Sequence, residues 1–159
     1  MMNGRECKQL IDPKKAELFT GSLGKLKETQ RAEPVAMVSA EGEVTHWFVP
    51  FIQEERALGF AIVSQAGKFV SYGLLSPRPS SKPGIDRHFF TEPPAGILEE
   101  IKERFPGMHL VSQAFSYDQS PQRWGWRVTI EQGKQAMVLF ATPGGWYQTA
   151  APKPGWEGA

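Results

Sequence analysis

The chain has 159 residues and a formal net charge of +1, so its overall field does not indicate a partner that is nucleic acid or a membrane surface. Its length fits one ordinary domain or two very small ones, and its 40% apolar and 22% charged residues are typical of a globular protein. Cys7 is the only cysteine, which excludes an intramolecular disulfide.

The N-terminal residues contain no apolar segment of the kind found in signal peptides, and no apolar run approaches the roughly 18 residues of a membrane span. We therefore expect a soluble, cytoplasmic protein. An extracytoplasmic origin stays open if a leader has been removed.

The first predicted element is a helix that starts at Asp12-Pro13, because Asp caps helix N-termini and Pro fits the first helical position. Apolar residues at helical spacing continue it to about residue 26, although two glycines weaken it. Four strands are predicted next, over 35–38, 44–52, 58–64 and 69–75, joined by short polar or glycine-containing turns. The first structural unit, residues 12–75, is thus a helix followed by an antiparallel meander.

Residues 76–94 are predicted to be a linker, because they contain five prolines and a Pro-Gly pair. Basic residues lie there next to Phe89-Phe90. Basic and aromatic side chains also occur together in sites where the bases of single-stranded nucleic acid stack on aromatic rings. Since the rest of the chain is neutral, we expect no nucleic-acid partner and expect the two phenylalanines to pin the linker to the core.

The second unit covers residues 95–149. It is predicted to contain a helix from about 94 to 105, ended by Pro106-Gly107, and strands over 109–117, 123–131 and 135–142. The pattern allows a further short strand around 146–148. The Pro/Gly-rich tail, 150–159, is predicted to be flexible.

A ten-residue segment occurs in both units. Residues 59–68 align without a gap on 125–134, with three identities: the opening glycine, the turn glycine and the lysine after it. Each copy is typical of a strand that enters a tight hairpin turn. The sequence therefore predicts an α+β fold of about seven antiparallel strands in two related halves, ordered α-β-β-β-β, linker, α-β-β-β.

The second unit resembles a known family. Its helix ends in Arg104-Phe105-Pro106-Gly107, and a strand and a polar turn then lead to the segment WGWRVTI at 124–130 and a Gly133-Lys134 turn. This pattern resembles the PepSY module, and tandem units of this shape resemble the β-lactamase-inhibitory-protein architecture. The resemblance covers residues 95–142 well and 12–75 loosely. It implies a non-catalytic role in contacting proteins or peptides, and it carries over no catalytic residue.

No catalytic constellation stands out. The three aspartates sit at predicted caps or turns, His46, His88 and His109 are too scattered for a metal site, and nothing nearby would activate Cys7. We therefore predict no catalytic residue, no metal and no cofactor. Acid–base pairs among the 14 glutamates leave the question of an enzyme open, although a non-enzymatic protein is favoured.

Large aromatic residues suggest a contact surface. Trp47 and Phe51 share one side of a predicted strand, and Trp124 and Trp126 share one side of another. We expect these four residues to bind an unidentified protein or peptide through a sheet face, or through strand addition at a sheet edge. Two alternatives stay open: a small-ligand-binding protein or enzyme with a cystatin-like pocket, and a homodimer with no other partner.

Overall fold

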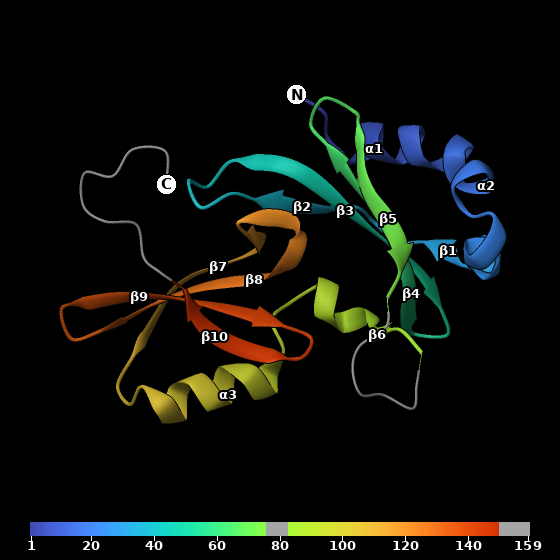
Figure 1. The fold of residues 1–159 in the computed structure, drawn as a ribbon. Coiled ribbons are helices and arrows are strands. Elements are labelled where there is room, and N and C mark those ends of the chain that lie inside the picture. The colour runs from blue at the N-terminus through green and yellow to red at the C-terminus, as the bar shows by residue number, and fades with distance from the viewer. Residues whose placement is uncertain (76–82, 150–159) are drawn as a thin grey trace.

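The computed structural model describes residues 1–75 and 83–149. It has an α+β fold with one ten-stranded mixed sheet, whose main path runs β10-β9-β8-β7-β2-β3-β4-β5 (Figure 1). The two shortest strands lie off this path, β1 against β3 and β6 against β4. The prediction of an α+β fold is confirmed, whereas the count of about seven strands was too low.

The strands have the following bounds: β1 (Gln30–Arg31), β2 (Val35–Val38), β3 (Val44–Gln53), β4 (Arg56–Ser64), β5 (Phe69–Leu74), β6 (Ile85–Asp86), β7 (His109–Asp118), β8 (Ser120–Gln132), β9 (Gln135–Thr142) and β10 (Gly145–Thr149). The α-helices are α1 (Gly4–Ile11), α2 (Lys15–Leu18) and α3 (Ala95–Arg104), and the 3₁₀-helices are η1 (Asp12–Lys14), η2 (Gly21–Glu28) and η3 (Arg87–Phe90).

The N-terminal helical segment begins earlier than predicted. Asn3, rather than Asp12, caps the first helix: its side chain accepts the Glu6 N–H at 2.9 Å and the Glu6 carboxylate accepts the Asn3 N–H at 3.2 Å, a capping box. The predicted helix from Asp12 is broken into η1, α2 and η2. Gly21 adopts a φ of 58°, which an α-helix does not accommodate.

One junction of the sheet is parallel, whereas the sequence predicted only antiparallel strands. β2 and β7 are joined through a single register pair, Val38 with Ser116, and the Ser116 hydroxyl donates to the Val38 carbonyl. Every other neighbouring pair in the sheet is antiparallel. Hydrogen-bonding geometry between strands distant in sequence leaves no periodic signal, so the sequence could not indicate this junction.

The core consists of two hydrophobic clusters. The N-terminal helical segment packs on one face of β3 and β4, where Ile11, Phe19 and Leu26 meet Val49 and Phe51. The other cluster lies on the opposite face and extends across β8 and β9 to η3 and α3. Alternation along β3 explains this division, because Phe48 belongs to the second cluster while its neighbour Val49 belongs to the first.

The segment before α3 is more ordered than a plain linker. Residues 76–82 of the predicted linker and the predicted tail at 150–159 lie outside the described residues. The remainder holds β6 and η3, and η3 directs Phe89 and Phe90 into the core with 6% and 4% exposure. This placement confirms the expected role of the two phenylalanines. Across the described part of the chain, no helix has the length and apolar character needed to cross a membrane.

Candidate functional site

Two of the four predicted contact residues lie beneath the N-terminal helical segment. Phe51 has no exposed surface, and its ring meets Phe19 edge-on with a centroid distance of 4.7 Å. Trp47 is half-buried and belongs to the same cluster, next to the start of α1 at Gly4.

Trp124 and Trp126 lie on the opposite face of the sheet. The Trp126 side chain is 8% exposed, and its indole N–H donates to the Phe89 carbonyl at 2.6 Å. Trp124 is half-buried within an aromatic cluster, with its ring centroid 4.9 Å from that of Phe48. The four residues therefore do not form one open face, because helices and η3 cover each pair from a different side.

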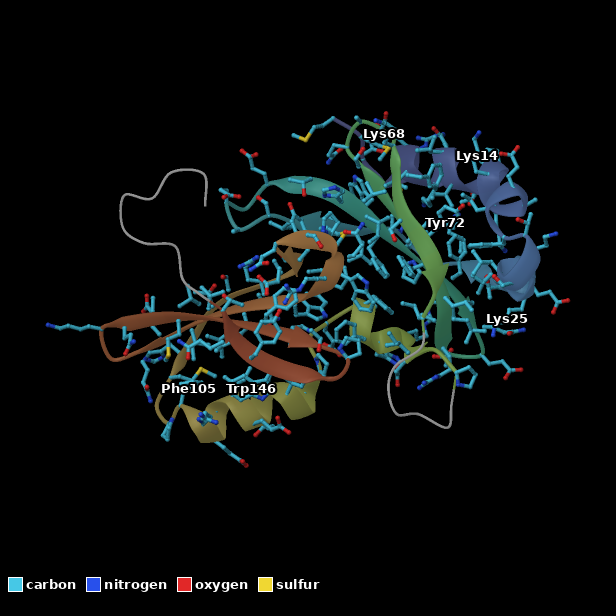
Figure 2. The ribbon with its side chains drawn as sticks, in the orientation of Figure 1. Lys14, Lys25, Lys68, Tyr72, Phe105 and Trp146 are labelled. Atoms are coloured by element: carbon cyan, nitrogen blue, oxygen red, sulfur yellow. The ribbon has the colours of Figure 1, made fainter. Side chains whose placement is uncertain are left out.

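The exposed apolar surface of this sheet includes a different set of side chains, on the edge strand β5. Val70, Tyr72 and Leu74 are 37%, 44% and 36% exposed, while Ser71 and Gly73 between them are half-buried, as is Phe69 before them. Tyr72 stands opposite Ala61 and Leu74 opposite Gly59, so both face the side of the sheet that carries the N-terminal helices. We name Val70, Tyr72 and Leu74 the β5 edge surface. Figure 2 labels Tyr72 on this strand.

Among the described residues, no strand pairs with the outer edge of β5. The Leu75 N–H bonds to the Leu58 carbonyl, and bonded residues alternate along an antiparallel ladder. Tyr72 and Leu74 consequently direct their backbone groups away from β4. Tyr72 and Leu74 thus combine exposed side chains with backbone donors and acceptors that bond to no described residue.

The turn that brings β5 back along β4 is set by glycine. Gly67 has a φ of 83°, a left-handed conformation that glycine adopts without steric cost. The β5 edge surface was not among the contact residues predicted from the sequence. An alternating pattern in the last strand before a proline-rich segment was the available signal, because such a strand is a candidate for a sheet edge.

Basic side chains lie on the same part of the molecule. Lys68 stands just before β5, and Lys14 and Lys25 project from the N-terminal helical segment (Figure 2). Lys14 approaches Glu17 at 3.7 Å, whereas Lys25 and Lys68 form no ion pair within the described ranges. Lys15 is different. Burial lowers its pKa, and its ammonium group donates to the carbonyls of Lys27 and Thr29, which ties the helical segment together.

The remaining reactive groups are dispersed. Cys7 is fully buried, and burial raises the pKa of its thiol to about 11, which keeps it protonated near neutral pH. Burial lowers the pKa of His46, which hydrogen-bonds to Thr45, while His88 pairs with Asp86 in another part of the fold. Within residues 1–75 and 83–149, no three His, Cys, Asp or Glu side chains are grouped so that they could hold a metal ion.

Comparison with protein-family models, with curated proteins and with solved structures gave no match to this chain.

Proposed function

We propose that this protein is a non-enzymatic binding module that takes up an extended segment of a protein or peptide along the outer edge of β5. The observation that carries the proposal is the coincidence of open backbone and exposed apolar side chains at Tyr72 and Leu74. An added strand bonds to such an edge through its main chain and places alternate side chains on the surface beside it.

The chemistry of the edge supports this choice. Long, exposed apolar edge strands invite pairing, and many proteins protect them with charges, proline or a bulge. β5 has a bulge opposite Ile62 and Val63, but Tyr72 and Leu74 lie beyond it in regular register. Tyrosine adds a large ring that orders at low entropic cost, and tyrosine is enriched among the residues that dominate binding energy at interfaces.

The proposal replaces the four aromatic residues of the sequence analysis with the β5 edge surface, and it keeps the predicted mode of strand addition. A PepSY-like tandem architecture stays part of the proposal. Modules of that kind contact proteins or peptides, and here β2–β5 and β7–β10 each form a run of neighbouring strands, an order that two such halves would produce.

A test can separate strand addition from general stickiness. Tyr72→Pro removes an outward N–H without removing a bond to β4, and proline is tolerated on the open side of edge strands. Tyr72→Thr removes the ring and keeps the N–H. We expect peptides selected from a random display library on the unmodified protein to lose binding to Tyr72→Pro and to retain part of it with Tyr72→Thr.

The location of binding is checked by amide hydrogen exchange. A selected peptide should protect the amides of Tyr72 and Leu74. Protection on β8 or β9 instead, or equal binding by all three proteins, would contradict the proposal. Sedimentation of the unmodified protein tests the homodimer alternative, since a dimer that Tyr72→Pro dissolves would identify a second copy of the chain as the partner.

A further inference from the structure

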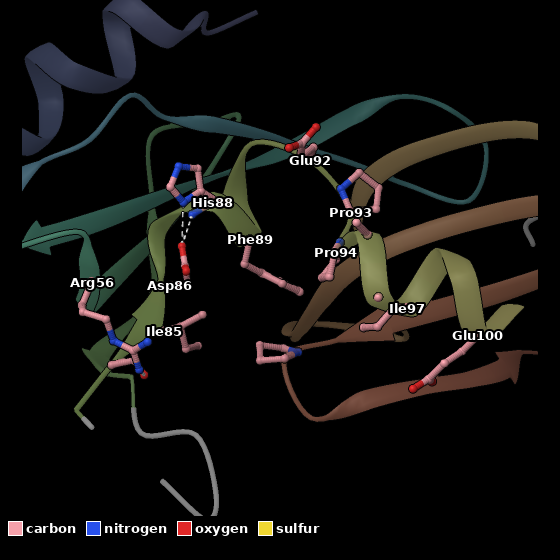
Figure 3. A pocket seen from close by; sticks show the side chains of 14 residues that line it. Arg56, Ile85, Asp86, His88, Phe89, Glu92, Pro93, Pro94, Ile97 and Glu100 are labelled. Atoms are coloured by element: carbon pink, nitrogen blue, oxygen red, sulfur yellow. Dashed lines mark hydrogen bonds and ion pairs between the residues drawn. The ribbon is translucent and has the colours of Figure 1, made fainter. Parts of the chain in front are cut away.

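A cleft of about 610 Å³ lies in a different part of the molecule from the β5 edge surface. It opens to solvent between the segment of β6 and η3 on one side and the first turn of α3 on the other (Figure 3). Pro143, in the turn between β9 and β10, completes its lining. The cleft is open to solvent rather than closed, and its walls combine two kinds of chemistry, apolar surface and negative charge.

The first kind is apolar. Ile85, Phe89, Ile97 and three prolines supply much of the lining, and the Phe89 ring is held in place because it packs against Phe90 and Trp124. Rigid walls of this kind suit a flat apolar group, because little side-chain entropy is lost when the group binds.

The second kind is negative charge. Asp86 and Glu100 line opposite sides of the cleft, with the Phe89 side chain pointing between them (Figure 3). Asp86 accepts the backbone N–H of His88 at 2.9 Å and its ring nitrogen Nδ1 at 2.8 Å, both on Oδ1, and these bonds lower the pKa of the Asp86 carboxyl. Glu100 accepts the Trp146 indole N–H on Oε2 at 2.9 Å. Each carboxylate is thus oriented by the protein, and no other described residue donates to its second oxygen.

The cationic groups in the cleft do not cancel this charge. The Arg56 guanidinium already donates to the carbonyls of Pro83 and Gly84, at 3.1 and 2.7 Å. His88, which also lines the cleft, is already paired with Asp86. The N-terminus of α3 adds about half a positive charge. A third carboxylate, Glu92, also lines the cleft, so the negative groups outnumber the positive ones.

The fold builds this arrangement through local constraints. β6 pairs with β4, which places Asp86 opposite Arg56. Gly84 is required at the approach to β6, because it has a φ of 77° and any Cβ there would overlap the carbonyl of Ala57.

We propose that the cleft binds an organic cation in which an amidinium or guanidinium group is joined to a flat or extended apolar body, the chemistry of an arginine side chain. The apolar body lies against Phe89 and Ile97, and the planar cation donates to Glu100, while Asp86 and Glu92 add negative charge to the cleft. This site is independent of the β5 edge surface and extends the chemistry of the protein beyond strand addition.

Three probes of nearly the same shape test the charge requirement: benzamidine, benzamide and benzoate. The indole N–H of Trp146 provides the readout in two-dimensional NMR of ¹⁵N-labelled protein, because it donates directly to Glu100. We expect a saturable shift with benzamidine, about tenfold or more weaker binding of benzamide, as for the loss of one charged hydrogen bond, and none with benzoate. Equal binding by benzamide, preferred binding of benzoate, or no shift with any probe would overturn the proposal.

Variants locate the site. Glu100→Gln keeps an acceptor for Trp146 and removes the charge, and we expect about tenfold weaker binding of benzamidine. Glu103→Gln is the matched control, because Glu103 is exposed on the same helix and does not line the cleft. Equal weakening by both variants would refute a specific site. Tyr72→Pro should leave benzamidine binding unchanged, so failure here and failure of strand addition are distinguishable.

Discussion

Two hairpins of this protein share a local pattern and differ in their place in the sheet. In β4–β5 and β8–β9 the turn glycines Gly67 and Gly133 have φ values of 83° and 63°. Yet β9 is flanked by β8 and β10, whereas β5 ends the sheet. At the matching positions of the two outer strands, Leu74 is 36% exposed and Phe140 is fully buried. Turn chemistry thus determines that a hairpin forms, and the neighbouring strands determine whether its outer surface is core or contact surface.

The glycines that begin the two repeated segments, Gly59 and Gly125, also have different neighbours. At Gly125 an added Cβ would overlap the backbone carbonyl of Ala141 and lie 2.8 Å from a Phe140 ring carbon. At Gly59 the nearest obstacles are the two methyl groups of Leu26, at 2.5 and 2.8 Å, from the helical segment above the strand, and the backbone oxygen of Gly73 follows at 3.0 Å. The missing side chain at Gly125 leaves room for the backbone of the neighbouring strand β9. At Gly59 it mainly leaves room for the helical segment that packs on β4.

The largest expected difference between the hairpins concerns the aromatic residues after these glycines. Trp126→Ala should lower the free energy of unfolding by about 3–5 kcal/mol, because it removes a buried ring and leaves the Phe89 carbonyl without its donor. Phe60→Ala should cost roughly 1–2 kcal/mol, because Phe60 is half-buried. Urea unfolding measures both. Equal losses would mean that the two positions are equivalent in packing.

The opening glycines should differ by a smaller amount. Gly125→Ala is expected to destabilise the fold by roughly 2–3 kcal/mol, because backbone must move to admit the methyl group. Gly59→Ala should cost less, about 1–2 kcal/mol, because the atoms nearest the added methyl group belong to the Leu26 side chain, which yields more readily than backbone. Thermal and urea unfolding of both variants check this order. The reverse order would contradict the inference that backbone crowds Gly125 while mainly a side chain crowds Gly59.

The turn glycines, in contrast, should behave alike. Gly67→Ala and Gly133→Ala each place a methyl group on a left-handed residue, which costs about 1 kcal/mol. Neither site is crowded, since the nearest neighbour of a Cβ at Gly67 is 3.8 Å away and Gly133 has none within 4 Å. Unfolding free energies that differ by more than experimental scatter would show that tertiary contacts shape these turns.

The smallest effect is expected at the β5 edge surface. Leu74→Thr should change the free energy of unfolding by no more than about 0.5 kcal/mol, because the side chain is exposed and threonine suits a strand. Urea unfolding of this variant and of the unmodified protein measures the difference. A loss well above 1 kcal/mol would show that this surface is covered in solution, which would weaken the case for strand addition.

Local rules account for much that the sequence could predict. The extent of α3, the four-strand run from β2 to β5 and the glycine turns followed from periodicity and turn chemistry. The start of α1 was missed because Asp12-Pro13 offered a stronger local signal than the capping box of Asn3 and Glu6, although that box was present in the sequence. β1 and β6, each of two residues, are too short for any periodic pattern.

The candidate sites were harder to predict because they depend on coverage. Trp126 and Phe51 have the residue types of an interface, but only the tertiary structure shows that η3 and the N-terminal helices lie over them. The cleft at Asp86 and Glu100 depends on two segments that meet only after folding. In both cases the sequence shows the chemical type of each side chain but not which segments pack over it or beside it.

The parallel junction of β2 and β7 has a consequence for the order of folding. Six of the seven neighbouring pairs along the main sheet path join strands consecutive in sequence, but Val38 and Ser116 are 78 residues apart. Closing so long a loop has an entropic cost in free energy. The single register pair offsets this cost only when the flanking meanders have already formed. We therefore expect the hairpins on both sides to form early and this junction to close late, as the step that commits the chain to one continuous sheet.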